Sequence, residues 1–174
     1  MQKLLLVVDM QNDFIDEALG TKEAVAIVPR VVEKICQFDG DIIYTRDTHF
    51  DNYMETQEGR NLPVPHCIRD THGWQLNEAV QTARDAKNAR GIDKLTFGSA
   101  ELPVLLKDRY PEGLASIELI GLCTDICVIS NAMVLKAHFP ETVISVDSSC
   151  CAGVTPQSHA NALEAMKMCQ ITVK

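Results

Sequence analysis

The feature of this 174-residue sequence that most restricts its fold is the alternation of short apolar runs with amphipathic stretches. The first run, residues 3–8 (KLLLVV), is almost entirely apolar, which is typical of a strand buried on both faces. Five later runs have the same character and are predicted as strands over residues 41–46, 91–96, 116–121, 143–147 and 170–173. Strands that alternate with helices along a chain form mostly parallel sheets.

The stretches between these runs have the periodicity of helices. Residues 24–38 place Ile27, Val31 and Ile35 on one helical face. Thr155 followed by Pro156 is typical of a helix start and predicts a helix that ends near Met168. Further helices are predicted over 76–87, 99–106 and 125–138. We therefore expect an α/β fold with a doubly wound, mostly parallel six-stranded sheet and helices on both faces, a Rossmann-like three-layer sandwich.

The length of the chain predicts one domain over residues 1–174. Residues 47–75 are rich in Asp, Asn, Gly, Pro and His, and lie between a predicted strand and a predicted helix. Loops of this length inside a compact domain are uncommon and usually functional. This segment is therefore a candidate part of the functional site.

Composition excludes several classes of partner. The net charge of −8 argues against binding to nucleic acids or anionic membranes, which favour basic surfaces. No apolar run approaches the ~18 residues of a membrane span. The N-terminal apolar run lacks the small-residue cleavage site of a secretory signal peptide, so a cytoplasmic protein is expected. Disulfides are rare in that compartment, so the seven cysteines of the chain are expected to be thiols. Neither G-x-G-x-x-G nor a Walker motif occurs, so no nucleotide cofactor is expected.

Ionisable side chains follow four of the predicted strands. Asp9 follows the first, Asp47 and His49 the second, Lys94 ends the third, and Cys127 follows the fourth. Sites in such sheets form at the carboxyl ends of the strands, so these side chains are expected to meet at one edge.

Cys127 is the candidate nucleophile. It follows a glycine-containing turn close to the start of a predicted helix, where free N–H groups favour a thiolate and can bind an oxyanion. Asp9 would accept the thiol proton, and the cation of Lys94 would stabilise the thiolate. A buried structural cysteine is the commoner role for this residue type, but it does not account for all four strand ends.

Asp47 and His49 are candidate metal ligands because residues two apart on a strand point to the same side. His66 is a third candidate and Glu58 a weaker fourth. One divalent transition metal would suit this set, zinc first, with manganese or iron as alternatives. The structural alternative for Asp47 and His49 is an ordinary hydrogen-bonded loop pair.

The other cysteines and histidines receive no chemical role. Cys67 is interpreted as a packing residue, and four more cysteines are predicted in the core: Cys36, Cys150, Cys151 and Cys169. The four-residue separation of Cys123 and Cys127 differs from the Cys-x-x-Cys spacing of redox sites. Three histidines have no nearby ligand candidates: His72, His138 and His159.

Five motifs resemble those of the isochorismatase-like cysteine hydrolases, and within them the nicotinamidase branch. They are VVDMQNDF at 7–14, TRDTHF at 45–50, LPVPHC at 62–67, DKLTFGSAEL at 93–102 and GLCTDICV at 121–128. The resemblance extends over nearly the whole chain.

The resemblance implies the catalytic triad Asp9, Lys94 and Cys127 and the metal ligands Asp47, His49 and His66. It also implies a non-proline cis peptide near Leu122–Cys123, with the N–H groups of Cys123 and Cys127 binding the oxyanion. Nicotinamidases tend to have an aromatic residue before the Pro-His-Cys stretch. None occurs at 61–65 here, so Phe14 would supply one wall of the substrate pocket, and Phe97 or Tyr53 another.

These residues predict a metal-dependent cysteine amidase that acts through a thioester. The resemblance implies that it converts a small amide such as nicotinamide to its acid and ammonia, as in NAD salvage. Two alternatives stay open. One is a hydrolase of another small amide or of a carbamoyl or ureido compound, and the other is a non-catalytic relative that uses Cys127 as a thiol sensor. An enol-ether hydrolase is disfavoured because that chemistry does not require the Cys, Asp and Lys set. The resemblance also implies a homo-oligomer.

Overall fold

The computed structural model of the protein describes residues 1–174 and contains one sheet of six strands. The strands are β1 (Gln2–Val8), β2 (Asp41–Asp47), β3 (Arg90–Lys94), β4 (Leu114–Leu122), β5 (Val143–Ala152) and β6 (Thr172–Val173). All neighbouring pairs are parallel, in the order β3-β2-β1-β4-β5-β6. The predicted doubly wound sheet is therefore confirmed, and it is entirely parallel.

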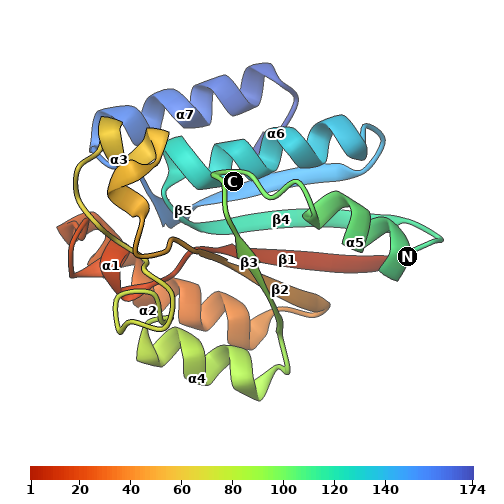
Figure 1. The fold of residues 1–174 in the computed structure, drawn as a ribbon. Coiled ribbons are helices and arrows are strands. Elements are labelled where there is room, and N and C mark those ends of the chain that lie inside the picture. Colours follow the sequence, from red (N-terminus) through yellow and green to blue (C-terminus); the bar gives the residue numbers. More distant parts are fainter.

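Helices cover both faces of the sheet (Figure 1). One face carries α1 (Asn12–Ile15), α2 (Lys22–Gln37) and α4 (Glu78–Ala86), and the other carries α5 (Leu102–Arg109), α6 (Ile129–His138) and α7 (Pro156–Met168). Each face has its own hydrophobic core. Within β1, Leu5 and Val7 belong to one core and Leu4 and Leu6 to the other, as the uninterrupted apolar run predicts.

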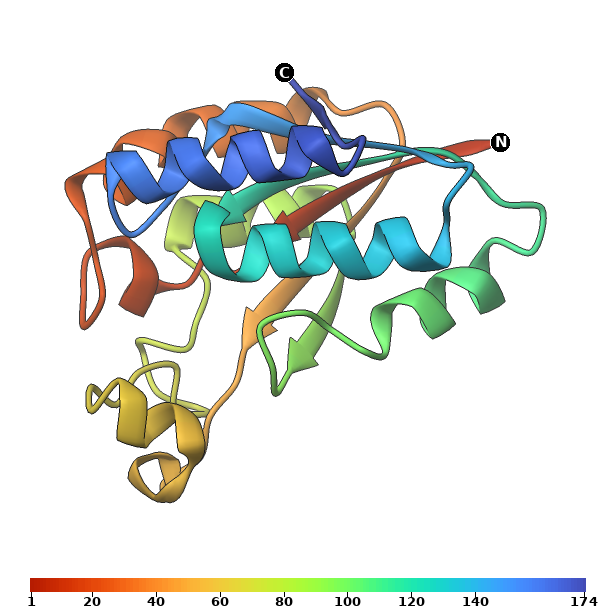
Figure 2. The same cartoon turned by 90° about the horizontal axis from the view of Figure 1, so that it is seen from above.

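The segment 47–75 is more ordered than its composition predicts. It contains a 3-10 helix at Tyr53–Glu55 and the helix α3 (Gln57–Asn61), which has Thr56 as its N-cap. Helices of three and five residues are too short to produce a recognisable apolar periodicity. Figures 1 and 2 place α3 beyond the arrowheads of the strands, at the carboxyl edge of the sheet.

Some of the other helix and strand boundaries match the prediction, and others differ from it. The capping box of Thr155 and Ser158 confirms the predicted start of α7. The helix α5 begins at Leu102, whose N–H donates to Ser99 Oγ at 3.2 Å. The strand β5 continues to Ala152, past the polar residues 147–149, because an irregularity in its pairing with β4 accommodates them.

The prediction of a buried core position was wrong for two cysteines. Cys36 and Cys169 are exposed, whereas Cys67, Cys150 and Cys151 are buried. Cys36 follows the buried Ile35 on α2, so the helical rotation turns its side chain away from the sheet. Cys169 caps the end of α7.

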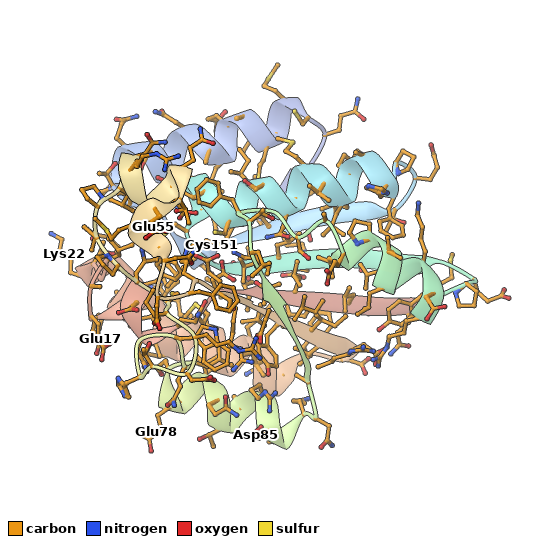
Figure 3. The ribbon with its side chains drawn as sticks, viewed as in Figure 1. Glu17, Lys22, Glu55, Glu78, Asp85 and Cys151 are labelled. Carbon is orange, nitrogen blue, oxygen red and sulfur yellow. The ribbon has the colours of Figure 1, made fainter.

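Figure 3 shows the side chains on the ribbon, with several exposed charged residues and the buried Cys151 labelled. The labelled charged side chains are all exposed: Glu17, Lys22, Glu55, Glu78 and Asp85. Cys151, by contrast, is only 4% exposed. None of the helices has both the length and the hydropathy that crossing a membrane requires.

Candidate active site

The predicted site residues meet where the strand order reverses, between β1 and β4. Ligand sites in open α/β sheets form at this point because the connections leave the sheet in opposite directions. Asp9 follows β1 directly, and Cys127 lies in a π-helical turn (Thr124–Val128) after β4. Asp47 and Lys94 end β2 and β3 and are paired with each other in the parallel register.

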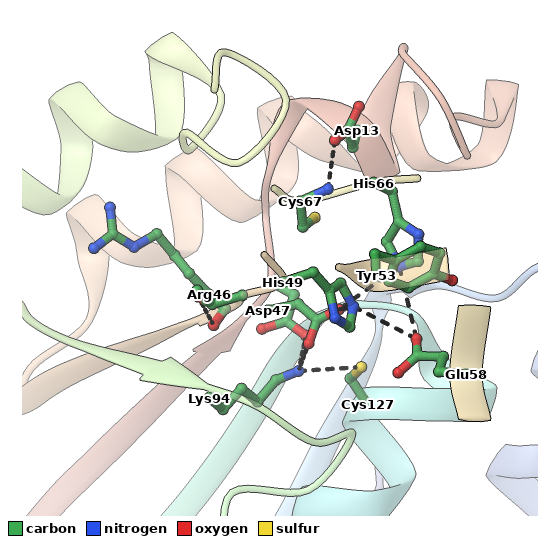
Figure 4. A network of polar contacts seen from close by, with 12 residues as sticks. Asp13, Arg46, Asp47, His49, Tyr53, Glu58, His66, Cys67, Lys94 and Cys127 are labelled. Atoms are coloured by element: carbon green, nitrogen blue, oxygen red, sulfur yellow. Dashed lines mark hydrogen bonds and ion pairs between the residues drawn. The ribbon is translucent and has the colours of Figure 1, made fainter. Parts of the chain in front are cut away.

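The ammonium group of Lys94 contacts the other two candidate catalytic residues, Asp9 and Cys127. Figure 4 shows its contacts with Cys127 and Asp47. Its Nζ lies 2.7 Å from Asp9 Oδ2 and 3.4 Å from Cys127 Sγ. It also lies 3.1 Å from Asp47 Oδ1. Asp9, Lys94 and Cys127 are exposed by 0%, 3% and 4%, so these groups interact with little screening by water.

The carboxyl group of Asp9 is held in one orientation. The Thr45 hydroxyl donates to Oδ1 at 2.6 Å, which leaves Oδ2 for Lys94. The backbone of Asp9 has φ +47°, a left-handed conformation that Asp tolerates better than most residues. Burial raises the pKa of Asp9 above its usual range, although Lys94 opposes the shift. A carboxylate with a raised pKa is a better proton acceptor.

The thiol of Cys127 is also shifted toward its protonated form. Burial raises the pKa of Cys127, the charge of Asp9 adds to this, and Lys94 opposes it. Burial alone would lower the pKa of Lys94, but the charges of Asp9 and Cys127 outweigh burial and raise it. Lys94 therefore stays a cation, and the thiol keeps its proton beside a carboxylate that can accept it.

The turn before Cys127 has the backbone features that the motif implied. The Leu122–Cys123 peptide bond is cis. Gly121 has φ +115°, and a Cβ atom there would lie 2.1 Å from Val8 O, so only glycine fits between β4 and β1. The N–H groups of Ile126 and Val128 both donate to Cys123 O, at 3.1 and 3.0 Å. These bonds close the π-helical turn that carries Cys127.

Asn131 is a buried residue at the site that sequence reasoning missed. Its Nδ2 donates to the carbonyls of Cys127 and Phe97, at 2.8 and 3.2 Å, and its Oδ1 accepts the N–H of Ser99 at 2.9 Å. One side chain of α6 thus joins the turn that carries Cys127 to the loop after β3. Its available signal was an amide just before the apolar run Ala132–Leu135 of this helix.

The four candidate metal ligands lie together on the other side of the pocket. One donor atom from each of Asp47, His49, Glu58 and His66 falls within 4.8 Å of the other three. His49 Nε2 is 3.1 Å from Asp47 Oδ2 and 3.5 Å from Glu58 Oε1. His66 Nε2 is 3.8 Å from each of the same two oxygens.

This group fits a divalent cation. The Nδ1–H of His66 donates to Val64 O at 2.8 Å, so its Nε2 faces Asp47 and Glu58 and can carry a lone pair. Burial would lower the pKa of His49, but its bonds to the two carboxylates raise it to about 9. A position that stabilises a proton between two carboxylates also favours a metal cation. Two imidazoles with two carboxylates suit zinc, manganese or iron.

A pocket of about 570 Å³ opens between the two groups of residues. Phe14 and Phe97, the predicted walls, both line it, and so do Leu62 and Ile126. Phe14 is buried and its ring lies 5.5 Å from that of His66, whereas Phe97 is 44% exposed. Tyr53 does not line the pocket; its hydroxyl donates to Leu62 O at 2.8 Å.

Sequence reasoning also missed Gln11, Asp13 and Thr45. All three are buried and bond to residues 36 or more positions away. Their signal was a polar side chain next to an apolar run, but nothing in the sequence named their partners.

Known proteins share both the sequence pattern and the fold. The chain matches the isochorismatase domain model over residues 3–174. It is 22% identical to a nicotinamidase of Schizosaccharomyces pombe, over 97% of this chain and 91% of that protein. The crystal structure of nicotinamidase/pyrazinamidase PncA from Bacillus subtilis aligns with a TM-score of 0.85 at 25% identity, covering 99% of both chains. The pyrazinamidase of Pyrococcus horikoshii in complex with zinc aligns with a TM-score of 0.81 at 28% identity, over 100% of this chain and 99% of that one.

Proposed function

Because the chain belongs to the isochorismatase family, we propose that it is a cysteine-dependent amidohydrolase that converts a small amide, nicotinamide in the first place, to its acid and ammonia. The observation that carries this proposal is the position of Lys94 Nζ, 2.7 Å from Asp9 Oδ2 and 3.4 Å from Cys127 Sγ. A base, a cation and a thiol are thus buried in contact, and the residue with the thiol, Cys127, lines the pocket. The nicotinamidases and pyrazinamidases among its relatives support the substrate class.

The first half-reaction forms a thioester. Asp9 accepts the proton of the Cys127 thiol as the sulfur attacks the amide carbon. The N–H groups of Cys123 and Cys127 would donate to the oxyanion of the tetrahedral intermediate. Asp9 then gives its proton to the leaving nitrogen, the C–N bond breaks, and ammonia departs.

The second half-reaction consumes one water molecule. Asp9 takes a proton from the water as its oxygen attacks the thioester carbon. The C–S bond breaks, the acid is released, and the proton returns to Cys127. Lys94 remains protonated throughout and offsets the negative charge that moves between Asp9 and the sulfur.

Four residues would hold a divalent transition metal, with zinc as the first candidate: Asp47, His49, Glu58 and His66. When bound, such a metal supplies open coordination positions that orient a substrate. The residues themselves form a polar part of the pocket lining, and Phe14, whose ring lies 5.5 Å from that of His66, and Phe97 belong to the apolar part. This arrangement favours an amide with a flat apolar body and a polar atom at its far end.

The experiment is ammonia release from a panel of amides by the metal-loaded protein. The panel contains nicotinamide, pyrazinamide, an aliphatic amide, an N-carbamoyl amino acid and a ureido acid. We expect turnover of nicotinamide, and an acyl group on Cys127 in the mass spectrum of acid-quenched protein. Cys127→Ala should abolish both signals, while Cys169→Ala, which removes an exposed thiol outside the pocket, should not.

The same panel tests the alternatives. The segment before His66 has Leu62 on the pocket wall instead of an aromatic residue, which favours a test of non-aromatic substrates. Turnover of only the carbamoyl or ureido compounds would replace nicotinamide as the substrate but keep the chemistry. Unchanged turnover by Cys127→Ala would overturn the nucleophile. No turnover and no acyl group with any amide would favour the thiol sensor.

A further inference from the structure

Three alternate residues of the segment after β1 contact three different parts of the site. Asp9 pairs with Lys94, Gln11 bonds to the backbone of Asp47, and Asp13 bonds to the backbone of Cys67. Asp47 and the neighbour of Cys67, His66, belong to the candidate metal group. The chemistry described so far uses only the first of the three residues.

Gln11 holds the backbone of Asp47 on both sides. Its Oε1 accepts the Asp47 N–H at 2.7 Å, and its Nε2 donates to Asp47 O at 2.9 Å. The second hydrogen of Nε2 goes to Trp74 O, also at 2.9 Å. Gln11 is 0% exposed, so these bonds do not compete with water. Gln11 therefore adds to the pairing with β3 in fixing the rotation of the Asp47 backbone, and with it the direction of the carboxylate.

Asp13 acts in the same way on the second ligand segment. Its Oδ2 accepts the Cys67 N–H at 2.6 Å, and this N–H belongs to the peptide bond that joins His66 to Cys67 (Figure 4). The Cys67 carbonyl accepts the N–H of His49 at 2.9 Å. Cys67 has φ +46°, a left-handed conformation that is uncommon for a non-glycine residue. The backbone beside His66 is thus held from both sides in an unusual conformation.

These side-chain bonds are not what fixes the segment to the fold. Its backbone is already bonded to residues 73–77: Asn12 N–H to Gln75 O at 3.0 Å, Asp13 N–H to Gly73 O at 3.0 Å, and Asn77 N–H to Met10 O at 2.9 Å. The side chains of Gln11 and Asp13 can therefore change while the main-chain pairing remains.

We propose that Gln11 and Asp13 are positioning residues of the metal group, with Gln11 orienting Asp47 and Asp13 orienting His66. The inference rests on the proposed metal group but not on the amidase reaction. Groups that orient metal ligands change metal affinity by about 10- to 100-fold when they are removed. Affinity of the resting protein for zinc is therefore the direct readout.

The test is a zinc titration of the metal-free protein against a chromophoric chelator. Gln11→Met removes all three bonds at similar size, and Asp13→Ala removes the bond to Cys67. We expect each to raise the Kd for zinc about 10- to 100-fold. Asp13→Asn keeps a carbonyl oxygen that can accept the same N–H and should restore most of the affinity. Hydrogen exchange at the Cys67 amide should be faster in Asp13→Ala than in the unaltered protein.

The matched control is Asn131→Leu. Asn131 is also a buried amide with three bonds to the backbone, but it serves the nucleophile side of the pocket. It should lower resistance to urea without changing the Kd for zinc more than about twofold, since its partners are not ligand segments. If Gln11→Met fails to fold, Gln11→Glu replaces it. This variant keeps only the acceptor for the Asp47 N–H and should give an intermediate Kd for zinc.

The outcomes separate the two hypotheses. Unchanged zinc affinity in Gln11→Met and Asp13→Ala overturns the inference, and so does an equal loss in Asn131→Leu, which would mean general destabilisation. Absence of zinc binding by the unaltered protein also overturns it. Zinc binding that follows the expected series without ammonia release supports the inference and contradicts the amidase.

Discussion

The two sides of the pocket are built on different kinds of backbone. The proposed nucleophile side consists of Asp9, which follows β1, Lys94, which ends β3, and Cys127, which lies in the π-helical turn after β4. These side chains are almost fully buried. On the metal side, Glu58 lies on the five-residue helix α3 and its side chain is 24% exposed. Strand ends in a sheet are held by many neighbours, whereas a short helix depends on a few bonds.

Asp47 is the residue common to both sides. Its Oδ1 contacts Lys94, and its Oδ2 contacts His49. The proposed reacting groups are thus placed by the sheet and the turn after β4, whereas three of the four candidate metal ligands lie on the segment between β2 and α4: His49, Glu58 and His66. Variants on the two sides should therefore fail in different ways.

After the complete loss expected for Cys127→Ala, the largest effect is expected for Asp9→Asn. The amide cannot accept the thiol proton, so kcat should fall about 10²- to 10⁴-fold. Asn tolerates the left-handed backbone at this position, so the fold should persist. Ammonia release and the Kd for zinc are the measurements. Asp16→Asn, which changes an exposed residue nearby, is the control. A loss of zinc affinity in Asp9→Asn alongside the loss of kcat would contradict the separation of the two sides.

Lys94→Met should lower stability more than any change on the metal side. It leaves the carboxylates of Asp9 and Asp47 buried without their cation, and loss of one partner of a buried pair costs about 3–5 kcal/mol. The free energy of urea unfolding gives the value. Glu58→Gln changes a partly exposed charge and should cost less than about 1 kcal/mol. Equal losses in the two variants would remove the distinction.

Zinc affinity should depend steeply on pH. His49 holds a proton up to a pKa of about 9, and a metal must displace it. Below pH 9, the need to displace this proton weakens apparent zinc binding by about tenfold for each unit by which the pH falls. The affinity for zinc should therefore rise from about pH 6 to about pH 8. Chelator competition across this range measures the slope. A flat profile would show that His49 does not bind the metal as a ligand.

The smallest effect is expected for Phe97→Ala. The ring is 44% exposed and lines the pocket, so the substrate loses part of one apolar wall. KM should rise about 3- to 10-fold with little change in kcat, because about 1 kcal/mol of apolar contact is lost. Steady-state kinetics with nicotinamide measure both constants. A fall in kcat alone would place Phe97 with the reacting groups.

Much of the nucleophile side is predictable from sequence, for a physical reason. Parallel strands bring their carboxyl ends to one edge, so polar residues after apolar runs must meet there. Asp9, Lys94 and Cys127 could be chosen in this way. The choice of Asp47 and His49 used the same rule.

The supporting residues could not be predicted by that rule. Gln11 and Asp13 bond to the backbone of segments 36 and 54 residues away, and backbone acceptors leave no mark in a sequence. The exposed Cys36 was predicted in the core because cysteine is usually buried and its neighbour Ile35 is a core residue. Residue type alone does not show which side of a helix a side chain occupies. The helix α3 is too short for its pattern to be recognised.

The pairing of Asp47 with Lys94 at the last position of the β2–β3 ladder has a consequence for how the sheet assembles. The strand β3 is a five-residue strand at the edge of the sheet, and such strands are prone to pair out of register. A slip by one residue would turn Lys94 to the opposite face and leave Asp9 and Asp47 together without a cation. Only one alignment of the edge strand neutralises these carboxylates. The ions that the proposed reaction uses therefore also select the native alignment of β3.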